Sequence, residues 1–233
     1  MIGFQEAQVN LPVHRSIIGI DVEKSTGPLR TNPVKQEIRQ ELYRMTEQAL
    51  AVTGIGDGDR WPFEDRGDGL LGLIHPNVPK ALLLTRFIPE LVRQLNLYDL
   101  GLSPEERARR SIRLRVVVHA GEVHQDEKGC FGESLDVACR MLDSPRLKRS
   151  LSRSASALAL VVSEQIYWDV VHHGYEGLQP GGFIQDFHVL VTGRRHRAWT
   201  HLPGENGARR GRLKPALALF SPVDLSQQQD RSA

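Results

Sequence analysis

One stretch constrains the fold of this chain more than any other: a polar turn between a short extended segment and an apolar strand. It reads Phe63-Glu-Asp-Arg-Gly-Asp-Gly-Leu-Leu-Gly-Leu-Ile74, a pattern that predicts a hairpin with its tip at 65–68. A second apolar strand runs into a polar turn at Ile17-Ile-Gly-Ile-Asp21-Val-Glu-Lys-Ser-Thr26. The two junctions carry Asp68 and Asp21, and we expect these carboxylates to meet at the ends of neighbouring strands.

Two such carboxylates have a characteristic chemistry. Mg²⁺ takes carboxylate oxygens and keeps its other positions for water and substrate phosphates, so the pair indicates phosphoryl chemistry of the two-metal kind. At about 4 Å and an effective dielectric of roughly 20, two carboxylates repel each other by about 4 kcal/mol. We therefore expect a cation to bridge Asp21 and Asp68.

The remaining periodicities predict helices and strands. The clearest helix begins at Asn32, the expected N-cap, has Pro33 in its first turn and ends at Gly54. Its apolar residues recur at three- or four-residue steps and mark one buried face: Val34, Ile38, Leu42, Met45, Ala49 and Val52. Further helices are expected at 78–97, 133–142 and 163–171, strands at 15–21, 112–123, 157–162, 186–192 and 198–202, and a loop or short solvated helix at 100–110.

Helices and strands mix here without strict alternation. This favours an α+β fold in which helices pack on a central, mostly antiparallel sheet. We expect an N-terminal arm at 1–14, one domain at 15–203 and a flexible C-terminal tail at 204–233.

Composition excludes several classes of protein. The 30 Lys and Arg nearly balance the 28 Asp and Glu, so nucleic-acid binding rests only on an arginine-rich segment at 194–214 and is not favoured. No apolar run is long enough to span a membrane, and no secretory signal is recognisable. Cys130 and Cys139 have no partner at metal-ligand spacing, which indicates free thiols and a cytoplasmic protein.

Taken together, these pieces resemble the catalytic domain of class III nucleotidyl cyclases, the adenylate and guanylate cyclase family. The likeness is greatest to compact actinobacterial versions, which carry an Asp-rich first strand, a Gly-Asp-Gly hairpin and an HAGEV strand, and it covers about residues 17–203. The resemblance implies a palm-like, ferredoxin-like βαββαβ domain that forms a homodimer with active sites between the chains. It also implies two Mg²⁺ or Mn²⁺ ions and conversion of a nucleoside triphosphate to a 3′,5′-cyclic nucleotide and pyrophosphate.

By this resemblance, Asp21 and Asp68 are the metal ligands. The residues that follow Asp21 would cradle the triphosphate with their backbone amides: Val22, Glu23, Lys24, Ser25 and Thr26. Glu64 takes the base-reading position, where a glutamate goes with guanine, because a carboxylate accepts from the N1 and N2 hydrogens. The second base-reading position holds Gly129, where an aspartate or cysteine is usual, with Cys130 beside it.

Two catalytic positions depart from the family pattern. On helix 133–142 the family has an asparagine and, four residues later, an arginine that stabilise the transition state; here these are Asp136 and Arg140. Asp136 cannot donate a hydrogen bond, and the two share a helix face on which they could instead pair with each other. The family's phosphate-neutralising lysine is replaced by Thr192, with Arg194 and Arg195 immediately after it as possible substitutes.

Two functions therefore stay open. The first is a nucleotidyl cyclase with GTP favoured over ATP or a pyrimidine triphosphate. The second is a catalytically degenerate domain that binds nucleotide and acts as a sensor or regulatory dimerisation module, with a possible effector protein as partner.

Overall fold

The computed structural model describes residues 11–205, so the expected arm and tail lie largely outside it. An eight-stranded sheet forms the centre, in the order β2-β3-β1-β4-β6-β8-β7, with β5 paired to β4. Among these pairs β4 and β6 run parallel and the others antiparallel, which confirms the expected sheet. The strands are β1 Val13–Val22, β2 Glu64–Asp65, β3 Gly69–Ile74, β4 Leu114–Asp126, β5 Gly129–Phe131, β6 Leu158–Ser163, β7 Ile184–Val191 and β8 Arg194–His201.

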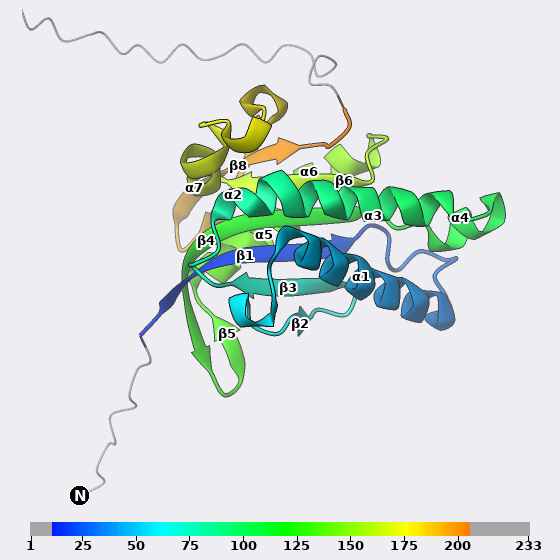
Figure 1. The fold of residues 1–233 in the computed structure, drawn as a ribbon, viewed down its shortest axis with the longest axis horizontal. Helices are drawn as coiled ribbons and strands as arrows, with labels where there is room; N and C mark the ends of the chain where they lie inside the picture. Colours follow the sequence, from blue (N-terminus) through cyan, green and yellow to red (C-terminus); the bar gives the residue numbers. More distant parts are fainter. Residues whose placement is uncertain (1–10, 206–233) are drawn as a thin grey trace, which may run out of the picture.

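Helices cover both faces of the sheet (Figure 1). The long helices α1 and α3 lie on one face, and α5 and α6 lie on the other. The helices are α1 Asn32–Thr53, α2 Lys80–Leu82, the π-helical turn η2 Leu83–Phe87, α3 Ile88–Leu100, α4 Pro104–Arg110, α5 Glu133–Leu142, α6 Pro145–Ser152, α7 Glu164–Ile166 and the π-helical turn η3 Tyr167–Val171. Single 3₁₀ turns occur at η1 Asp57–Asp59, η4 Tyr175–Gly177 and η5 Pro180–Gly182.

Strand β1 shows why the central strands are apolar throughout. Successive side chains of a strand point to opposite faces, so Ile18 packs among the residues under α1 and α3 while Ile17 packs among those under α5 and α6. Because both faces are covered, a continuous apolar run replaces the alternating pattern of a half-exposed strand. No helix among residues 11–205 is long and apolar enough to cross a membrane.

The structure corrects several details of the expected elements. Strand β1 begins at Val13, inside the expected arm. The N-cap of α1 is Thr31, not Asn32, and its side chain makes no capping bond. Val52 was expected on the buried face of α1 but is 55% exposed. Successive residues of a helix are rotated by 100°, and in the last turn of α1 it is Thr53 that lies on the buried face. Helix α6 was not expected.

Candidate active site

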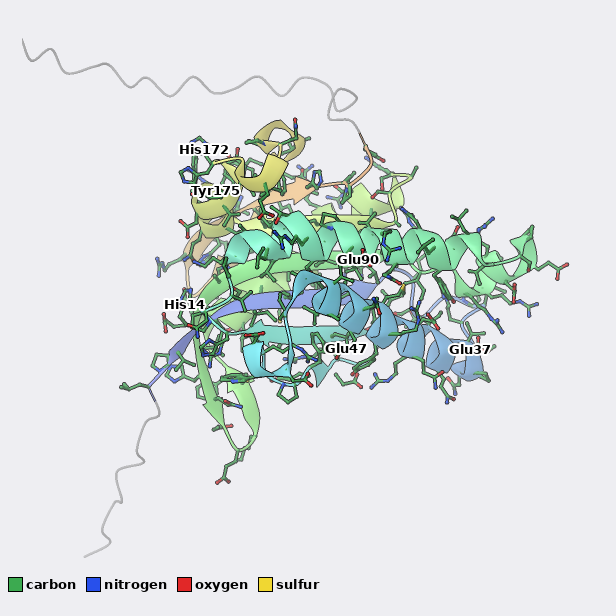
Figure 2. The ribbon with its side chains drawn as sticks, viewed as in Figure 1. His14, Glu37, Glu47, Glu90, His172 and Tyr175 are labelled. Carbon is green, nitrogen blue, oxygen red and sulfur yellow. The ribbon has the colours of Figure 1, made fainter. Side chains whose placement is uncertain are left out.

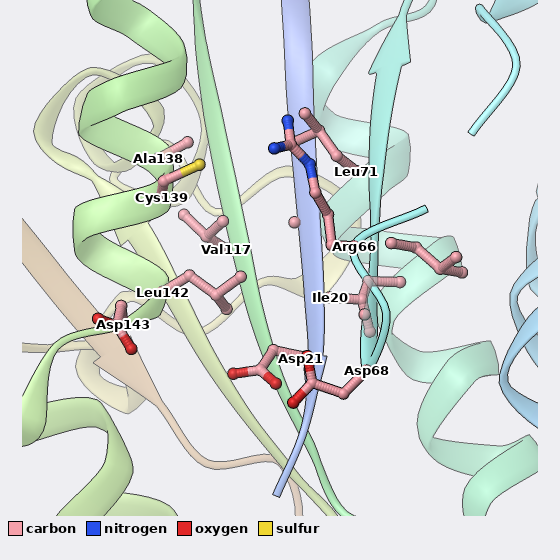
Figure 3. A pocket seen from close by; sticks show the side chains of 13 residues that line it. Ile20, Asp21, Arg66, Asp68, Leu71, Val117, Ala138, Cys139, Leu142 and Asp143 are labelled. Atoms are coloured by element: carbon pink, nitrogen blue, oxygen red, sulfur yellow. The ribbon is translucent and has the colours of Figure 1, made fainter. Parts of the chain in front are cut away.

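Asp21 and Asp68 come together where β1 and β3 lie side by side. Asp21 is opposite Gly69 in the strand register, and the Val22 amide donates to the Asp68 carbonyl at 3.1 Å. A Cβ at Gly69 would lie 2.2 Å from the Ile20 carbonyl oxygen, so glycine permits this close approach. Figure 3 shows the two carboxylates next to each other at one end of a cavity that both line.

A cation from the chain itself already lies against Asp21. Arg115 on β4 is opposite Asp21 in the register and donates two hydrogen bonds to its Oδ2 oxygen, one from Nε at 3.1 Å and one from Nη2. Burial raises the pKa of Asp21, the charge of Asp68 adds to the rise, and Arg115 opposes it. The Ser25 hydroxyl donates to Asp68 Oδ2. The repulsion expected between the carboxylates is thus offset in part by Arg115.

The donor set suits a hard divalent ion. Among the described residues no group of three or more His, Cys, Asp or Glu side chains could hold a metal. His172, for example, is an exposed residue in the surface turns that follow η3 (Figure 2). Asp21 and Asp68 nevertheless each keep one oxygen, Oδ1, with no hydrogen bond or ion pair within the described chain. Mg²⁺ is commonly held by one or two carboxylates plus water and substrate phosphate, so these two residues fit such an ion.

The turn after Asp21 presents fewer free amides than expected. The amides of Val22 and Glu23 donate to the carbonyls of Asp68 and Arg113, and the buried Glu23 carboxylate pairs with the Arg113 guanidinium at 2.9 Å. The amides of 24–26 have no acceptor within residues 11–205. Lys24 adopts a left-handed backbone with φ of 55°, a conformation found in anion-binding nests of successive amides. Within this segment, the amides of 24–26 are therefore the ones available to an anion.

Glu64, on β2 of the same hairpin, lies near Gly129 and Cys130 of β5. Burial and then a hydrogen bond to Glu64 raise the pKa of the Cys130 thiol to about 12. Gly129 has a φ of 133°, and a Cβ built there would lie 3.9 Å from Glu64 Oε1. That backbone favours glycine, which accounts for the missing side chain at this position. On β5, it is the Cys130 side chain that contacts Glu64.

The residues on α5 and β8 lie apart from the carboxylates. Asp136 and Arg140 are exposed, and of the two alternatives for Arg140 the pairing with Asp136 is absent, since no salt bridge within 4 Å joins them in the described chain. Neither lines the cavity that holds Asp21, although Cys139 of the same helix does. Arg194 is 75% exposed and lies 3.7 Å from Glu133, on a strand separated from β1 by β4 and β6. One chain does not bring these groups to Asp21 and Asp68.

Sequence reasoning missed two arginines that contact site residues. Arg115 forks onto Asp21, and Arg66 donates to Glu64 Oε2 at 2.9 Å. A signal for Arg115 was present: it is a charged residue just before the wholly apolar part of its strand, where burial requires an opposite charge. Arg66 had no comparable signal, because an arginine in a polar turn is ordinary.

Comparison with known proteins concerns the fold. No protein-family model matches the sequence, and no curated protein matches it. Among solved structures, an adenylate/guanylate cyclase/hydrolase from Silicibacter pomeroyi superposes with a TM-score of 0.57 at 18% identity, covering 83% of this chain and 99% of that one. The adenylyl cyclase CyaB from P. aeruginosa gives 0.53 at 9%, covering 86% and 99%. The guanylate cyclase domain of RhGC from Catenaria anguillulae, in complex with GTP, gives 0.52 at 14%, covering 83% and 98%. Residues 11–205 thus have the fold of adenylate and guanylate cyclase catalytic domains.

Proposed function

We propose that this protein is a nucleotidyl cyclase that acts as a homodimer, uses two Mg²⁺ or Mn²⁺ ions and favours GTP. The observation that carries the proposal is the meeting of Asp21 and Asp68 at one end of a cavity, within a fold shared with cyclase domains. The free amides of 24–26 on one side and the cluster around Glu64 on the other provide groups for phosphates and for a base, respectively.

The reaction joins the ribose 3′ oxygen to the α-phosphorus and breaks the bond from that phosphorus to the oxygen of the leaving pyrophosphate, while the 3′ hydroxyl loses its proton. Asp21 and Asp68 would hold the divalent ions, which supply charge neutralisation and activation of the attacking hydroxyl. The amides of 24–26 would bind phosphate oxygens. Arg140 would donate to the phosphorus-bound oxygens as negative charge builds up on them, a contribution worth about 10²–10³ in turnover for one preorganised donor.

A second copy of the chain is needed for this chemistry. Arg140 and Arg194 are exposed and do not reach Asp21 within one chain, whereas a two-fold dimer can bring the α5 surface of one protomer to the carboxylates of the other. Each active site would then combine Asp21 and Asp68 of one protomer with Arg140 of its partner. Thr192 has no positive charge to neutralise the triphosphate. Arg194 and Arg195, which follow it in the sequence, would supply that charge instead.

A second candidate function is a nucleotide-binding sensor or regulatory module that contacts an effector protein. Asp136 favours it, because a carboxylate accepts but does not donate hydrogen bonds and so repels phosphate oxygens. Thr192 favours it as well, since it lacks the positive charge that triphosphate chemistry uses. This function requires nucleotide binding without turnover.

The test is a panel of the four nucleoside triphosphates with Mg²⁺ or Mn²⁺, analysed for cyclic products by mass spectrometry. Cyclic GMP should predominate, and Asp68→Asn should abolish it. If none of the four nucleotides is cyclised by an intact, metal-bound dimer, the proposal that the protein is a cyclase is wrong. Thermal stabilisation of the protein by a nucleotide, without formation of a cyclic product, would then support the sensor function. If the double variant Asp136→Asn, Thr192→Lys forms a cyclic product, the native chain is a catalytically degenerate cyclase.

A further inference from the structure

A second hollow of the molecule is an apolar groove of about 400 Å³ between α3 and the turns η4 and η5. It shares no lining residue with the cavity that holds Asp21 and Asp68. Glu176 is the only carboxylate in its lining, which contains no lysine or arginine. The apolar side chains that line it come from η2, α3, β6 and the segment 178–183: Leu84, Ile88, Val92, Leu160, Leu178 and Phe183. A lining of this kind suits an apolar occupant.

Polar contacts fix the walls of this groove relative to each other. Arg86 of η2 donates to the Glu176 carboxylate from Nε at 3.4 Å and from Nη2 at 3.2 Å. Glu176 adopts a left-handed backbone with φ of 49°, a conformation that a residue other than glycine keeps only where its surroundings hold it. On β8, the His201 ring stacks on Phe183 with centroids 4.6 Å apart, and its Nδ1 lies 2.8 Å from the Gly182 carbonyl oxygen. The groove is therefore a fixed part of the folded chain.

The described chain ends beside the groove. His201, the last residue of β8, and Pro203 both belong to the groove lining, and Glu205 is the last residue described. The Ser156 hydroxyl donates to the Pro203 carbonyl at 2.8 Å, and the Ala155 amide donates to Glu205 Oε1 at 3.1 Å. These bonds anchor the point from which residues 206–233 continue.

The sequence beyond that point contains an apolar run within reach of the groove. It reads Ala216-Leu-Ala-Leu-Phe220, and Leu217 is 12 positions after Glu205. An extended residue spans about 3.3 Å, so this connection can cover roughly 40 Å. Closing a loop of this length costs little free energy, and a short tether gives a segment an effective concentration in about the millimolar range. The run at 216–220 therefore has an advantage over any separate molecule that is present at micromolar concentration.

We propose that the groove between α3 and the turns η4 and η5 is the docking site of residues 216–220 of the same chain. Leu217, Leu219 and Phe220 are removed from water against the apolar lining, and this burial drives the contact. Both partners belong to one polypeptide, so the contact needs no second protein. It is independent of the nucleotide chemistry at Asp21 and Asp68.

Disulfide trapping in the full chain tests the contact directly. In a chain with Cys130→Ser and Cys139→Ser, Val92→Cys places a thiol in the groove lining and Leu219→Cys places one in the apolar run. The matched control replaces Val92→Cys by Leu97→Cys, a residue of the same helix that is 52% exposed and outside the groove lining. Under mild oxidation the pair at 92 and 219 should form its disulfide about 10-fold faster than the control pair, or more.

Mass spectrometry of a mixture of ¹⁵N-labelled and unlabelled chains shows whether the disulfide lies within one chain. A bond within one chain supports the proposal. A bond found only between chains would assign the groove to the segment of a second copy and overturn it. Equal rates for the pair at 92 and 219 and for the control pair would overturn it as well.

Thermal unfolding gives a second measurement on chains that keep their cysteines. The triple variant Leu217→Ser, Leu219→Ser, Phe220→Ser should lower the melting temperature by roughly 5 °C, because the burial it removes is offset only in part by the ordering of the segment. Val223→Ser with Leu225→Ser, which changes apolar residues outside the run, should leave the melting temperature unchanged. An unchanged value in the triple variant would leave the groove to a separate protein and overturn the proposal. Neither measurement involves a nucleotide, so both outcomes are independent of cyclase activity.

Discussion

Two regions of this molecule carry charged residues suited to nucleotide chemistry, and they are built in opposite ways. At the end of β1 and in the β2–β3 hairpin, three carboxylates have partners in the chain: Asp21 has Arg115, Asp68 has the Ser25 hydroxyl and Glu64 has Arg66. On α5, Asp136 and Arg140 are exposed, and neither forms a salt bridge within the described chain.

The difference shows which region is complete by itself. Buried charge is stable only when paired, so the carboxylate region can fold and keep its geometry in a single chain. Exposed cations cost little without a partner and remain free to contact another molecule. We therefore expect changes in the first region to affect both stability and chemistry, and changes in the second to affect chemistry alone.

The largest effect is expected from the carboxylates, which also differ from each other. Asp68→Asn should lower cyclisation by about 10³-fold through loss of a metal ligand, with little change in melting temperature because Asp68 is exposed. Asp21→Asn should lose the same activity and also about 3 kcal/mol of stability, since it leaves the buried Arg115 guanidinium unpaired. Cyclic-product assays and urea unfolding measure the two effects; equal stability loss in both variants would contradict the comparison.

A complementation experiment examines the exposed region. Arg140→Ala should reduce turnover by about 10²–10³-fold without changing the melting temperature. When Arg140→Ala and Asp68→Asn proteins are mixed in equal amounts and allowed to exchange subunits, half of the dimers are mixed and each contains one complete site of two. About a quarter of the wild-type activity should return. Absence of any recovery in confirmed mixed dimers would show that each chain builds its own site.

Stability toward acid depends on a buried histidine of β4, the strand that pairs with β1 and β6. His119 on β4 is buried, its Nδ1 lies 2.8 Å from the Ser163 hydroxyl, and burial, with smaller effects of His196 and His14, lowers its pKa to about 4. The unfolded chain, with a histidine pKa near 6.5, binds more protons between those values, so stability should fall as pH drops from 6.5 to 4, by up to about 3 kcal/mol. Urea unfolding across this range measures the loss. His119→Gln should flatten the dependence, and an unchanged slope would assign it to other groups.

The smallest effect concerns the turn between β7 and β8. Thr192 has a φ of 48° and Gly193 a φ of 78°, the left-handed pair of a two-residue hairpin turn, where Asn-Gly is preferred and a β-branched residue is strained. Thr192→Asn should raise the free energy of unfolding by about 1 kcal/mol, a rise of roughly 2–4 °C in melting temperature for a domain of this size. Thr192→Val, which keeps the branched Cβ, should bring no such gain.

Much of the fold could be predicted because its signals are local. Helix α5 lies at the predicted Glu133–Leu142, since an amphipathic period and the Ser144-Pro145 stop are both legible in sequence. The Asp21 and Asp68 junctions could be predicted for the same reason: at Asp21 an apolar strand runs into a polar turn, and at Asp68 a polar turn leads into an apolar strand. Helix α6 was missed because its eight residues are too few, and too rich in arginine, lysine and serine, to show a clear period.

What the sequence by itself determined is the set of elements, the α+β mixture and the approach of two acidic turns, because hydrophobic period and turn chemistry depend on neighbours along the chain. Tertiary structure alone decided other contacts: Arg115 lies against Asp21, and Arg140 stays at the surface without a salt bridge in the described chain. The contact between Asp21 and Arg115 depends on sheet order and strand register, which place residues 94 positions apart side by side, and no local pattern in the sequence indicates which of many arginines will lie there.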